Sequence, residues 1–263
     1  MKIEIDLNKT LEQNATSYFE KSKLARKKIA GLKIATEKQD KFLEKKLIEK
    51  EVKEKKKERK RKWFEKYRWF FTSDNLLVIG GKTAIQNEEI VKKYMKKDDL
   101  YFHAEVYGAP HCIIKLSESK KLHEVPETSK KEVASFAITF SKAFERGVSS
   151  ADAYSVKPEQ VSKRAPSGTS MGTGAFMIYG EREYFKKTPI DIAIGINIKE
   201  NTLMSAPFLA CKKWCSNVIH LRQGDIEKNK MAKLLKEKFL EKGNEFLIDE
   251  ILSLLPNGKF DIV

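Results

Sequence analysis

Cysteine is scarce in this sequence, and no stretch is apolar enough for a signal peptide or a membrane span. The three cysteines, Cys112, Cys211 and Cys215, make an odd count, and none belongs to a Cys-x-x-Cys pair. This pattern excludes a disulfide framework and paired zinc knuckles, and it predicts free thiols in a reducing compartment. We therefore expect a cytoplasmic protein with no membrane partner.

Histidine is also rare, and nucleotide-binding fingerprints are absent. The sequence has no Gly-x-x-x-x-Gly-Lys-Ser/Thr loop and no Gly-x-Gly-x-x-Gly stretch. Two loose ligand sets remain for a metal: His103, Glu105 and His111 around a Gly-Ala-Pro turn, and Cys211, Cys215 and His220. We favour a hydrogen-bonded structural role for the histidines. The prediction is no catalytic residue, metal or cofactor, and the alternative from another class is a metal-dependent enzyme built on the first set.

Acidic residues are outnumbered, and the excess of positive charge lies at one end. Over the whole chain 52 Lys and Arg face 37 Asp and Glu, a formal net charge of +15. Residues 1–62 contain 21 Lys and Arg against 11 Asp and Glu, so this segment carries +10 of the total. A localised basic segment is typical of proteins that bind phosphate backbones or anionic membranes. We favour a nucleic acid, because the apolar face of the segment is narrow.

The basic segment has a helical pattern. Residues 3–7 (IEIDL) alternate like a short strand. A coiled-coil seam of alternating four- and three-residue steps follows, formed by Leu11, Ala15, Tyr18, Ala25, Ile29 and Leu32. The arm is either one helix over residues 11–62 or a helical hairpin broken near Gly31, and the sequence does not choose between them.

An α+β pattern begins at Trp63. The block WFEKYRWFF and the run LLVIGG predict a β-hairpin that turns at residues 73–75. Further strands are expected at LYFHAEV and HCIIKL on either side of a YGAP turn, and at AYSVKPEQVS, AFMIYG and PIDIAIGINI, the last with its five isoleucines on one face. Helices are expected at 129–146, at 225–255, and at 84–96, where the inward-facing residues are Ile85, Ile90, Val91 and Tyr94.

Two segments combine cations with residues suited to RNA. The loop from Gln160 to Gly180 contains three glycines before its last residue, five Ser or Thr hydroxyls and the adjacent Lys163 and Arg164. It is compatible both with phosphate binding through backbone N–H groups and with a plain hairpin connection. In the block from Arg59 to Phe71 the aromatic rings either stack on bases or form the core that anchors the arm, and we favour the core. The surrounding cations remain available for phosphates.

Several motifs together resemble the NFACT-R domain. They are R-K-W-F-E-K-Y-R-W-F, N-L-L-V-I-G-G-K, Q-N-E-E-I-V-K-K-Y-M, D-L-Y-F-H-A-E-V-Y-G-A, P-E-Q-V-S-K-R-A-P-S-G-T and T-G-A-F-M-I-Y-G, in the family's order over residues 60–185. The sequence departs from the family pattern at Tyr107, where histidine is usual. The residues before residue 60 are similar to the family's coiled-coil region, and those from Ser205 to Lys230 to its C-terminal region.

The resemblance is to the NEMF-type subunits of ribosome-associated quality control. It implies a non-enzymatic protein that binds the large ribosomal subunit, its rRNA and tRNA, and contacts a ubiquitin ligase through the coiled coil. The family's NFACT-N part, with its tRNA-handling motif, is expected to lie outside this sequence. The alternative is a stand-alone module that binds nucleic acids through charge alone, without a ribosome-specific role.

The combined interpretation is an α+β protein in three parts: a short strand and basic coiled-coil arm over residues 1–62, a compact NFACT-R domain over 63–200, and a small C-terminal appendage over 201–263. The predicted phosphate contacts are Arg61, Lys62, Lys66, Arg68, Lys163, Arg164, Ser167, Gly168 and Thr169. The predicted structural and binding-motif residues are Trp63, His103, Gly108, His111, Pro166 and Gly174.

Overall fold

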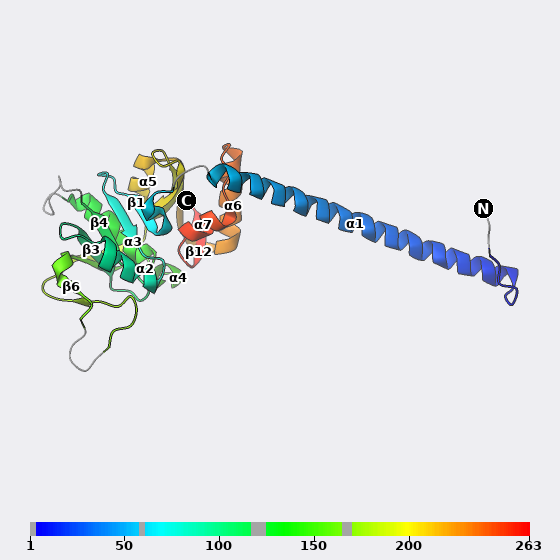
Figure 1. Cartoon of the computed structure of the whole chain (residues 1–263), viewed down its shortest axis with the longest axis horizontal. Helices are drawn as coiled ribbons and strands as arrows, with labels where there is room; N and C mark the ends of the chain where they lie inside the picture. Colours follow the sequence, from blue (N-terminus) through cyan, green and yellow to red (C-terminus); the bar gives the residue numbers. More distant parts are fainter. Residues whose placement is uncertain (1–3, 58–60, 117–124, 165–169) are drawn as a thin grey trace. The chain divides into compact units, whose positions relative to one another are not determined.

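The computed structural model describes residues 4–57, 61–116, 125–164 and 170–263, without the side chains of residues 41 and 44–57. It divides the chain into two units, Met1–Arg59 and Lys60–Val263. The described part of the first unit contains one helix, and the second unit is a mixed α+β domain (Figure 1). The predicted fold class is therefore confirmed.

The arm is a single helix, α1 (Leu11–Lys57), of 47 residues. At about 1.5 Å per residue it is about 70 Å long. Gly31 continues the helix, so the hairpin alternative is wrong. Apolar residues of the predicted seam, among them Leu11, Ile29 and Leu32, are exposed.

The predicted strand at residues 3–7 is wrong over its described residues, 4–7, because local hydrogen bonds fold this segment into a turn. The Asp6 N–H donates to Asn14 Oδ1 at 3.0 Å, and the Asn14 amide donates back to the Asp6 carbonyl at 3.0 Å. A capping box between Thr10 and Gln13 then starts α1. These bonds satisfy the backbone locally, without a partner strand.

The second unit is built around a six-stranded antiparallel sheet with the order β1-β2-β4-β3-β5-β8. Its strands are β1 (Arg68–Phe71), β2 (Leu77–Gly80), β3 (Leu100–Ala104), β4 (Cys112–Lys115), β5 (Ser150–Val156) and β8 (Glu183–Pro189). Asn75 closes the β1–β2 turn at φ 65°, a left-handed conformation that asparagine tolerates well. The predicted hairpin and the two strands around the YGAP turn are confirmed.

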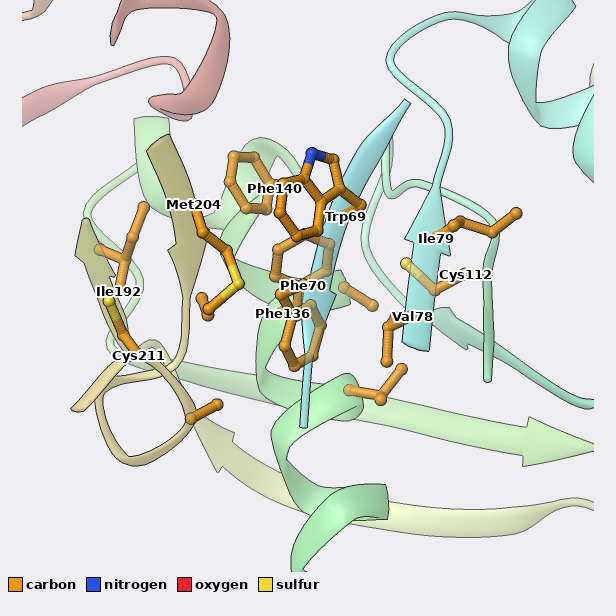
Figure 2. Packing of buried hydrophobic residues seen from close by; sticks show 14 of the residues in the cluster. Trp69, Phe70, Val78, Ile79, Cys112, Phe136, Phe140, Ile192, Met204 and Cys211 are labelled. Atoms are coloured by element: carbon orange, nitrogen blue, oxygen red, sulfur yellow. The ribbon is translucent and has the colours of Figure 1, made fainter. Parts of the chain in front are cut away.

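Helix α3 (Glu127–Thr139) covers this sheet and contacts β3, β4, β5 and β8. The ring of Phe136 lies 4.6 Å from that of Phe70 on β1 and 4.7 Å from that of Phe140. Figure 2 shows this aromatic cluster beside Met204, which belongs to the second sheet. Of the aromatic block, Phe64, Tyr67, Trp69 and Phe70 are buried in the core, as favoured, whereas Trp63 is half exposed. That this core anchors the arm stays a prediction.

The second sheet has four antiparallel strands in the order β10-β9-β11-β12. They are β9 (Ile192–Asn197), β10 (Thr202–Ala206), β11 (Cys215–Glu227) and β12 (Lys259–Ile262), accompanied by α5 (Phe208–Trp214), α6 (Lys228–Glu241) and α7 (Ile248–Leu254). Strands β1 and β10 contact each other, so both sheets share one core. The predicted domain limit at residue 200 falls in the β9–β10 turn and stays a prediction.

Smaller elements complete the second unit. They are a 3-10 turn at Trp63–Lys66, α2 (Ala84–Glu89) with a π-helical turn at Ile90–Tyr94, α4 (Lys142–Glu145), a 3-10 turn at Pro158–Gln160, and the short pair β6 (Val161–Ser162) and β7 (Met177–Ile178). Among the described residues, no helix is long and apolar enough to cross a membrane.

Some details differ from the sequence-based expectations. The helix predicted at 129–146 is divided between α3 and α4. Ile85, expected to face inward, is 73% exposed because it lies in the first turn of α2 at the surface. Strand β9 is buried on both faces, and Ile190 and Ile198 lie outside it, so the five isoleucines do not form one face of a strand.

Candidate functional site

A cleft of about 640 Å³ opens on the second unit. Its walls are the β2–α2 turn (81–84), the β3–β4 hairpin (107–111) and the segment 173–178 that leads into β7. Side chains of β3 and β5 form its floor, including Tyr101, His103 and Tyr154. The cleft therefore joins segments that are far apart in the sequence, from Arg68 to Arg182.

One end of the cleft is cationic. The guanidinium of Arg68 lies 4.1 Å from the centre of the Phe140 ring, and its Nη1 donates to the Ser253 carbonyl at 3.4 Å. Burial lowers the pKa of Arg68 to about 10, and burial and the nearby Arg68 lower the pKa of Lys82. Neither cation has a carboxylate partner among the residues that the structure describes. An anion at this end would compensate both charges.

The floor of the cleft is formed by two neutral imidazoles whose ring centres lie 4.6 Å apart. His111 is buried, and its Nδ1 lies 2.6 Å from the Tyr101 hydroxyl. His103 Nδ1 lies 3.3 Å from the Pro110 carbonyl oxygen. Burial lowers the pKa of His103, and burial with the nearby His103 and Lys163 lowers the pKa of His111 to about 3. Both rings are therefore uncharged at neutral pH.

A glycine brings the α2 wall close to this floor. The His111 N–H donates to Asn87 Oδ1 at 3.1 Å, and the Gly81 N–H donates to the His111 carbonyl at 3.4 Å. A Cβ at Gly81 would lie 2.0 Å from Asn87 Oδ1, so only glycine permits this approach.

The opposite wall is held to α2 by one carboxylate. Glu88 accepts hydrogen bonds from Lys92 at 2.6 Å, the Gly174 N–H at 2.9 Å and Lys163 at 3.0 Å. These bonds, that of Lys92 first, lower the pKa of Glu88 to about 2. Lys163 also donates to the carbonyls of Gly172 at 2.8 Å and Ala175 at 3.2 Å. The ammonium of Lys163 thus ties the loop to the helix.

The structure brings together five of the residues singled out from the sequence: Arg68, His103, Gly108, His111 and Gly174 all line the cleft. Lys163 does not line the cleft, but its ammonium is 5.1 Å from the ring centre of Phe176, which does.

The other predicted residues are not part of the cleft lining. Trp63 stacks on Tyr94 with ring centres 4.7 Å apart. Lys66 pairs with Glu89 at 2.8 Å, which is the first cause of its raised pKa, and Lys62 lies 3.9 Å from Glu200. Arg61 and Arg164 are exposed, and Pro166, Ser167, Gly168 and Thr169 lie outside the described residues. Phosphate contact by any of these residues stays a prediction.

Sequence reasoning missed Lys82 and Arg182. Lys82 follows Gly80 and Gly81 at the end of a strand, which was the available signal for a cation held close to the backbone. Arg182 lies 4.6 Å from the Tyr154 ring centre and 3.4 Å from Glu105 Oε1. No local pattern places Arg182 beside β3, because the contact arises from the pairing of β5 with β8.

The alternative catalytic and metal sites are not assembled. Glu105 contacts Arg182 and Tyr184, and His220 pairs with Asp191 at 3.0 Å. Within the described ranges no three His, Cys, Asp or Glu side chains are grouped to hold a metal ion. Residues 168–172 (GTSMG) match a Gly-x-Ser-x-Gly pattern, but the following element is the strand β7, whereas a nucleophile elbow leads into a helix.

The family comparison matches this region. Residues 66–180, which include most of the cleft, match the family described as the NFACT protein RNA binding domain. This segment is therefore similar to NFACT-R domains. The resemblance seen in the sequence motifs is thereby confirmed.

The curated relatives of the chain are ribosome quality control proteins. The archaeal Rqc2 homolog aRqcH of Methanocaldococcus jannaschii is 41% identical over 204 residues, which are 77% of this chain and 29% of the relative. The ribosome quality control complex subunit NEMF homolog of Drosophila melanogaster is 41% identical over 137 residues, 52% of this chain and 13% of the relative. The chain thus spans less than a third of the length of either relative.

A solved structure is also similar over part of the chain. The C-terminal part of the fibronectin/fibrinogen-binding protein from Streptococcus suis superposes with a TM-score of 0.39 at 24% identity, over 50% of this chain and 48% of that one. This likeness is too weak to support a functional argument.

Proposed function

We propose that the chain binds RNA through the cleft and its rim, as a non-enzymatic component of ribosome-associated quality control. The observation that carries the proposal is the pair Arg68 and Lys82, two cations without carboxylate partners among the described residues, in a cleft of an RNA-binding domain. Phosphate oxygens are the ligands that such cations bind in RNA.

The charge of the chain supports the same partner. The basic arm adds a sequence-independent attraction for phosphate backbones, because each neutralised phosphate releases counterions. Arg61 and Arg164 are exposed and available at the surface of the second unit. The proposed targets are tRNA and the rRNA of the large ribosomal subunit, which are the partners that the family resemblance implies; the name of the Drosophila melanogaster relative refers to the ribosome.

The arm is proposed to contact a protein partner. Leu11, Ile29 and Leu32 of the predicted seam are more than half exposed on α1, and an apolar stripe on a helix is buried by another helix in coiled coils. A subunit of a ubiquitin ligase is the partner that the family resemblance implies. A cytoplasmic location follows from these proposed partners.

The proposed role of the cleft is tested by measuring the affinity of the full chain for tRNA at several salt concentrations. Lys82→Gln should weaken binding several-fold and reduce the salt slope by about 1, because one phosphate contact is lost. Lys233→Gln removes the same charge from the exposed face of α6 and serves as the matched control. An equal loss of affinity for tRNA in both variants would show that binding depends only on the net charge of the chain.

The loop next to the cleft is tested separately. Reversing the charge of Arg164, which is exposed, should weaken binding without loss of stability, because its side chain has no described partner. Reversing Lys163 as well should weaken binding further, but it also breaks the contact with Glu88. Unchanged binding of Arg164→Glu to tRNA would show that this residue does not contact the RNA.

The ribosomal role is tested by sedimentation of the tagged chain in cell lysate at physiological and raised salt. Co-migration with free large subunits, enriched when translation is stalled, is the expected result. The alternative of a general nucleic-acid-binding module predicts equal affinity for duplex DNA, tRNA and ribosomal subunits. That outcome, with migration at the top of the gradient, would replace the ribosomal proposal.

A further inference from the structure

We infer that the cleft holds a single unpaired nucleotide, with its phosphate at Arg68 and Lys82 and the edge of its base on His103 and His111. The inference rests on the proposed function and deepens it, since it names the unit of RNA that the cleft recognises. The same chemistry is offered by a free mononucleotide, and the experiment below separates the two sources.

The carbonyl of Pro110 fixes the tautomer of His103. Its Nδ1 lies 3.3 Å from the carbonyl oxygen of Pro110, and a carbonyl oxygen only accepts hydrogen bonds. Nδ1 must therefore carry the proton. In a neutral imidazole the other nitrogen is then unprotonated, so Nε2 of His103 is an acceptor.

The opposite tautomer is assigned to His111. The hydroxyl of Tyr101 is buried, and its one hydrogen-bond partner among the described residues is His111 Nδ1 at 2.6 Å. If the hydroxyl accepted this bond, its own proton would be left without a partner in the core, which is costly. The hydroxyl therefore donates to Nδ1, and Nε2 of His111 carries a proton and is a donor.

The two imidazoles thus present one acceptor and one donor side by side. No hydrogen-bond partner of either Nε2 occurs in the described part of the chain. Each nucleobase has a donor next to an acceptor on its Watson–Crick edge, which is free only in an unpaired base. The floor is complementary to such an edge, and a paired base in a duplex cannot present it.

The walls and size of the cleft suit a base. The Phe176 ring centre lies 5.4 Å from that of His111, and the Tyr154 ring centre lies 6.1 Å from that of His103. Tyr107 is 79% exposed at the mouth, where it is free to cover a bound base. A volume of about 640 Å³ falls in the range of small-ligand sites, about 300–1,000 Å³.

The cationic end suits the phosphate. The guanidinium of Arg68 is fixed against the Phe140 ring and the Ser253 carbonyl, so little side-chain freedom is lost when it binds an anion. Lys228, held by the Leu255 carbonyl at 2.9 Å, adds a third positive charge near Arg68, and burial with this repulsion lowers the pKa of Lys228. A phosphate would relieve the repulsion among these cations.

The inference is tested by calorimetric titration of the full chain with the four nucleoside 5′-monophosphates, the corresponding nucleosides and inorganic phosphate. We expect saturable binding of at least one monophosphate, and at least tenfold weaker binding of its nucleoside and of phosphate. Methylation of the donor group on the Watson–Crick edge (N1 of guanine, N3 of uracil, or both amino hydrogens of adenine or cytosine) should weaken binding of the best ligand by about tenfold, since its hydrogen bond to Nε2 of His103 is lost.

Two variants test which residues contact the base of the ligand and which contact its phosphate. His103→Phe keeps a ring but removes the acceptor, so it should abolish the discrimination against the methylated base. Lys82→Gln should weaken binding of the monophosphate and leave the affinity for the nucleoside unchanged. Lys233→Gln is the control, and unfolding curves of all variants establish that they are folded. Equal affinity of His103→Phe for the methylated and unmethylated ligands supports the base contact, and retained discrimination overturns it.

Competition separates this inference from the proposed function. If single-stranded RNA binds and the best mononucleotide displaces it, the cleft takes an unpaired nucleotide of RNA. If RNA binds but no mononucleotide binds or competes up to millimolar concentration, the inference is wrong and the proposed function stands. If a mononucleotide binds and RNA does not, the pocket is real but its ligand is a free nucleotide, and the proposed function is wrong.

Discussion

The ammonium of Lys163 lies 3.0 Å from Glu88 Oε2, although the two residues are 75 positions apart in the sequence. The same oxygen accepts the Gly174 N–H at 2.9 Å. Together these bonds hold the segment 172–176 against α2 and fix the width of the cleft. The loop that the sequence marks as glycine-rich is therefore attached to the domain at a defined point.

Replacing Glu88 should release this loop. In Glu88→Ala we expect faster amide hydrogen exchange in residues 172–176, because the Gly174 N–H loses its acceptor and Lys163 its counter-ion. Glu89→Ala, on the same helix but paired with Lys66, is the matched control. Equal protection of the loop in Glu88→Ala and the wild-type protein would show that this carboxylate does not hold it.

The contacts of Glu88 also predict how the stability of the loop depends on pH. The pKa of Glu88 is about 2 in the folded state against an ordinary value of 4.5, because its donors favour the ionised form. The stabilisation is complete above pH 4.5 and is lost as the pH falls toward 2. Loop protection in the wild-type protein should therefore fall over that range, while Glu88→Ala should show no such step.

A methyl group at Gly174 should destabilise the domain, and one at Gly172 should not. Gly174 has φ 77°, and a Cβ there would lie 2.7 Å from the Ala84 carbonyl oxygen, whereas a Cβ at Gly172 meets nothing within 4 Å. We expect Gly174→Ala to cost more than about 1 kcal/mol of unfolding free energy in denaturant titrations, and Gly172→Ala to be nearly neutral. Similar midpoints for the two variants would contradict the closeness of the loop to α2.

Contacts such as these, between segments far apart in the chain, could not be predicted from the sequence, whereas local elements could. The hairpin from Arg68 to Gly80 was predictable because aromatic and aliphatic residues flank a turn of Ser, Asp and Asn. The 13-residue strand β11 was missed, because Asn217 and Gly224 interrupt its pattern and its pairing with β9 and β12 shifts register. Apolar periodicity reports which face is buried, but it carries no information on which distant segments meet.

In the cleft, too, some contacts were predictable from the sequence and others were not. His103 and His111 could be paired from the sequence, because one tight turn joins their strands. Two neighbours of His111 could not be predicted, because Asn87 and Lys163 arrive from a helix and a loop through the folding of the whole unit. The predicted phosphate role of Lys163 overlooked Glu88 for this reason, since an ion pair across 75 residues leaves no local pattern.

Acidification should destabilise the domain through the floor of the cleft. The pKa of His111 is about 3 in the folded state against an ordinary value of 6.5, because burial disfavours the charged ring. The unfolded chain binds a proton below pH 6.5 and the folded chain does not, so stability falls as the pH drops from 6.5 toward 3. The expected slope is up to about 1.4 kcal/mol per pH unit from this residue.

The check is a set of denaturant titrations between pH 7.5 and 4.5, with an NMR titration of the imidazole signals of the folded chain. The His111 ring signal should not move in this range, while the unfolding free energy declines below pH 6.5. A ring signal that titrates near pH 6.5 would show that His111 is open to water and that burial does not hold its ring neutral in this pH range.

The two sheets should unfold together. Met204 on β10 is fully buried, and Figure 2 shows it beside Phe70 and Phe136, which belong to the first sheet and its covering helix. Met204→Ala should therefore cost about 2–5 kcal/mol, and the loss should reach both sheets because they share this core. Leu240→Ala, at an exposed leucine of α6, should change stability by less than about 0.5 kcal/mol.

Two tryptophans report on the two sheets separately. Trp69 lies on β1, and Trp214 ends α5 beside the second sheet. Chains in which one of these two is the only remaining tryptophan, with Trp63 also replaced, follow each part by fluorescence. With a shared core both signals should move to the same lower denaturant midpoint in Met204→Ala. A shift of the Trp214 signal alone would mean that residues after 200 unfold independently, which is the behaviour of the separate C-terminal region predicted from the sequence.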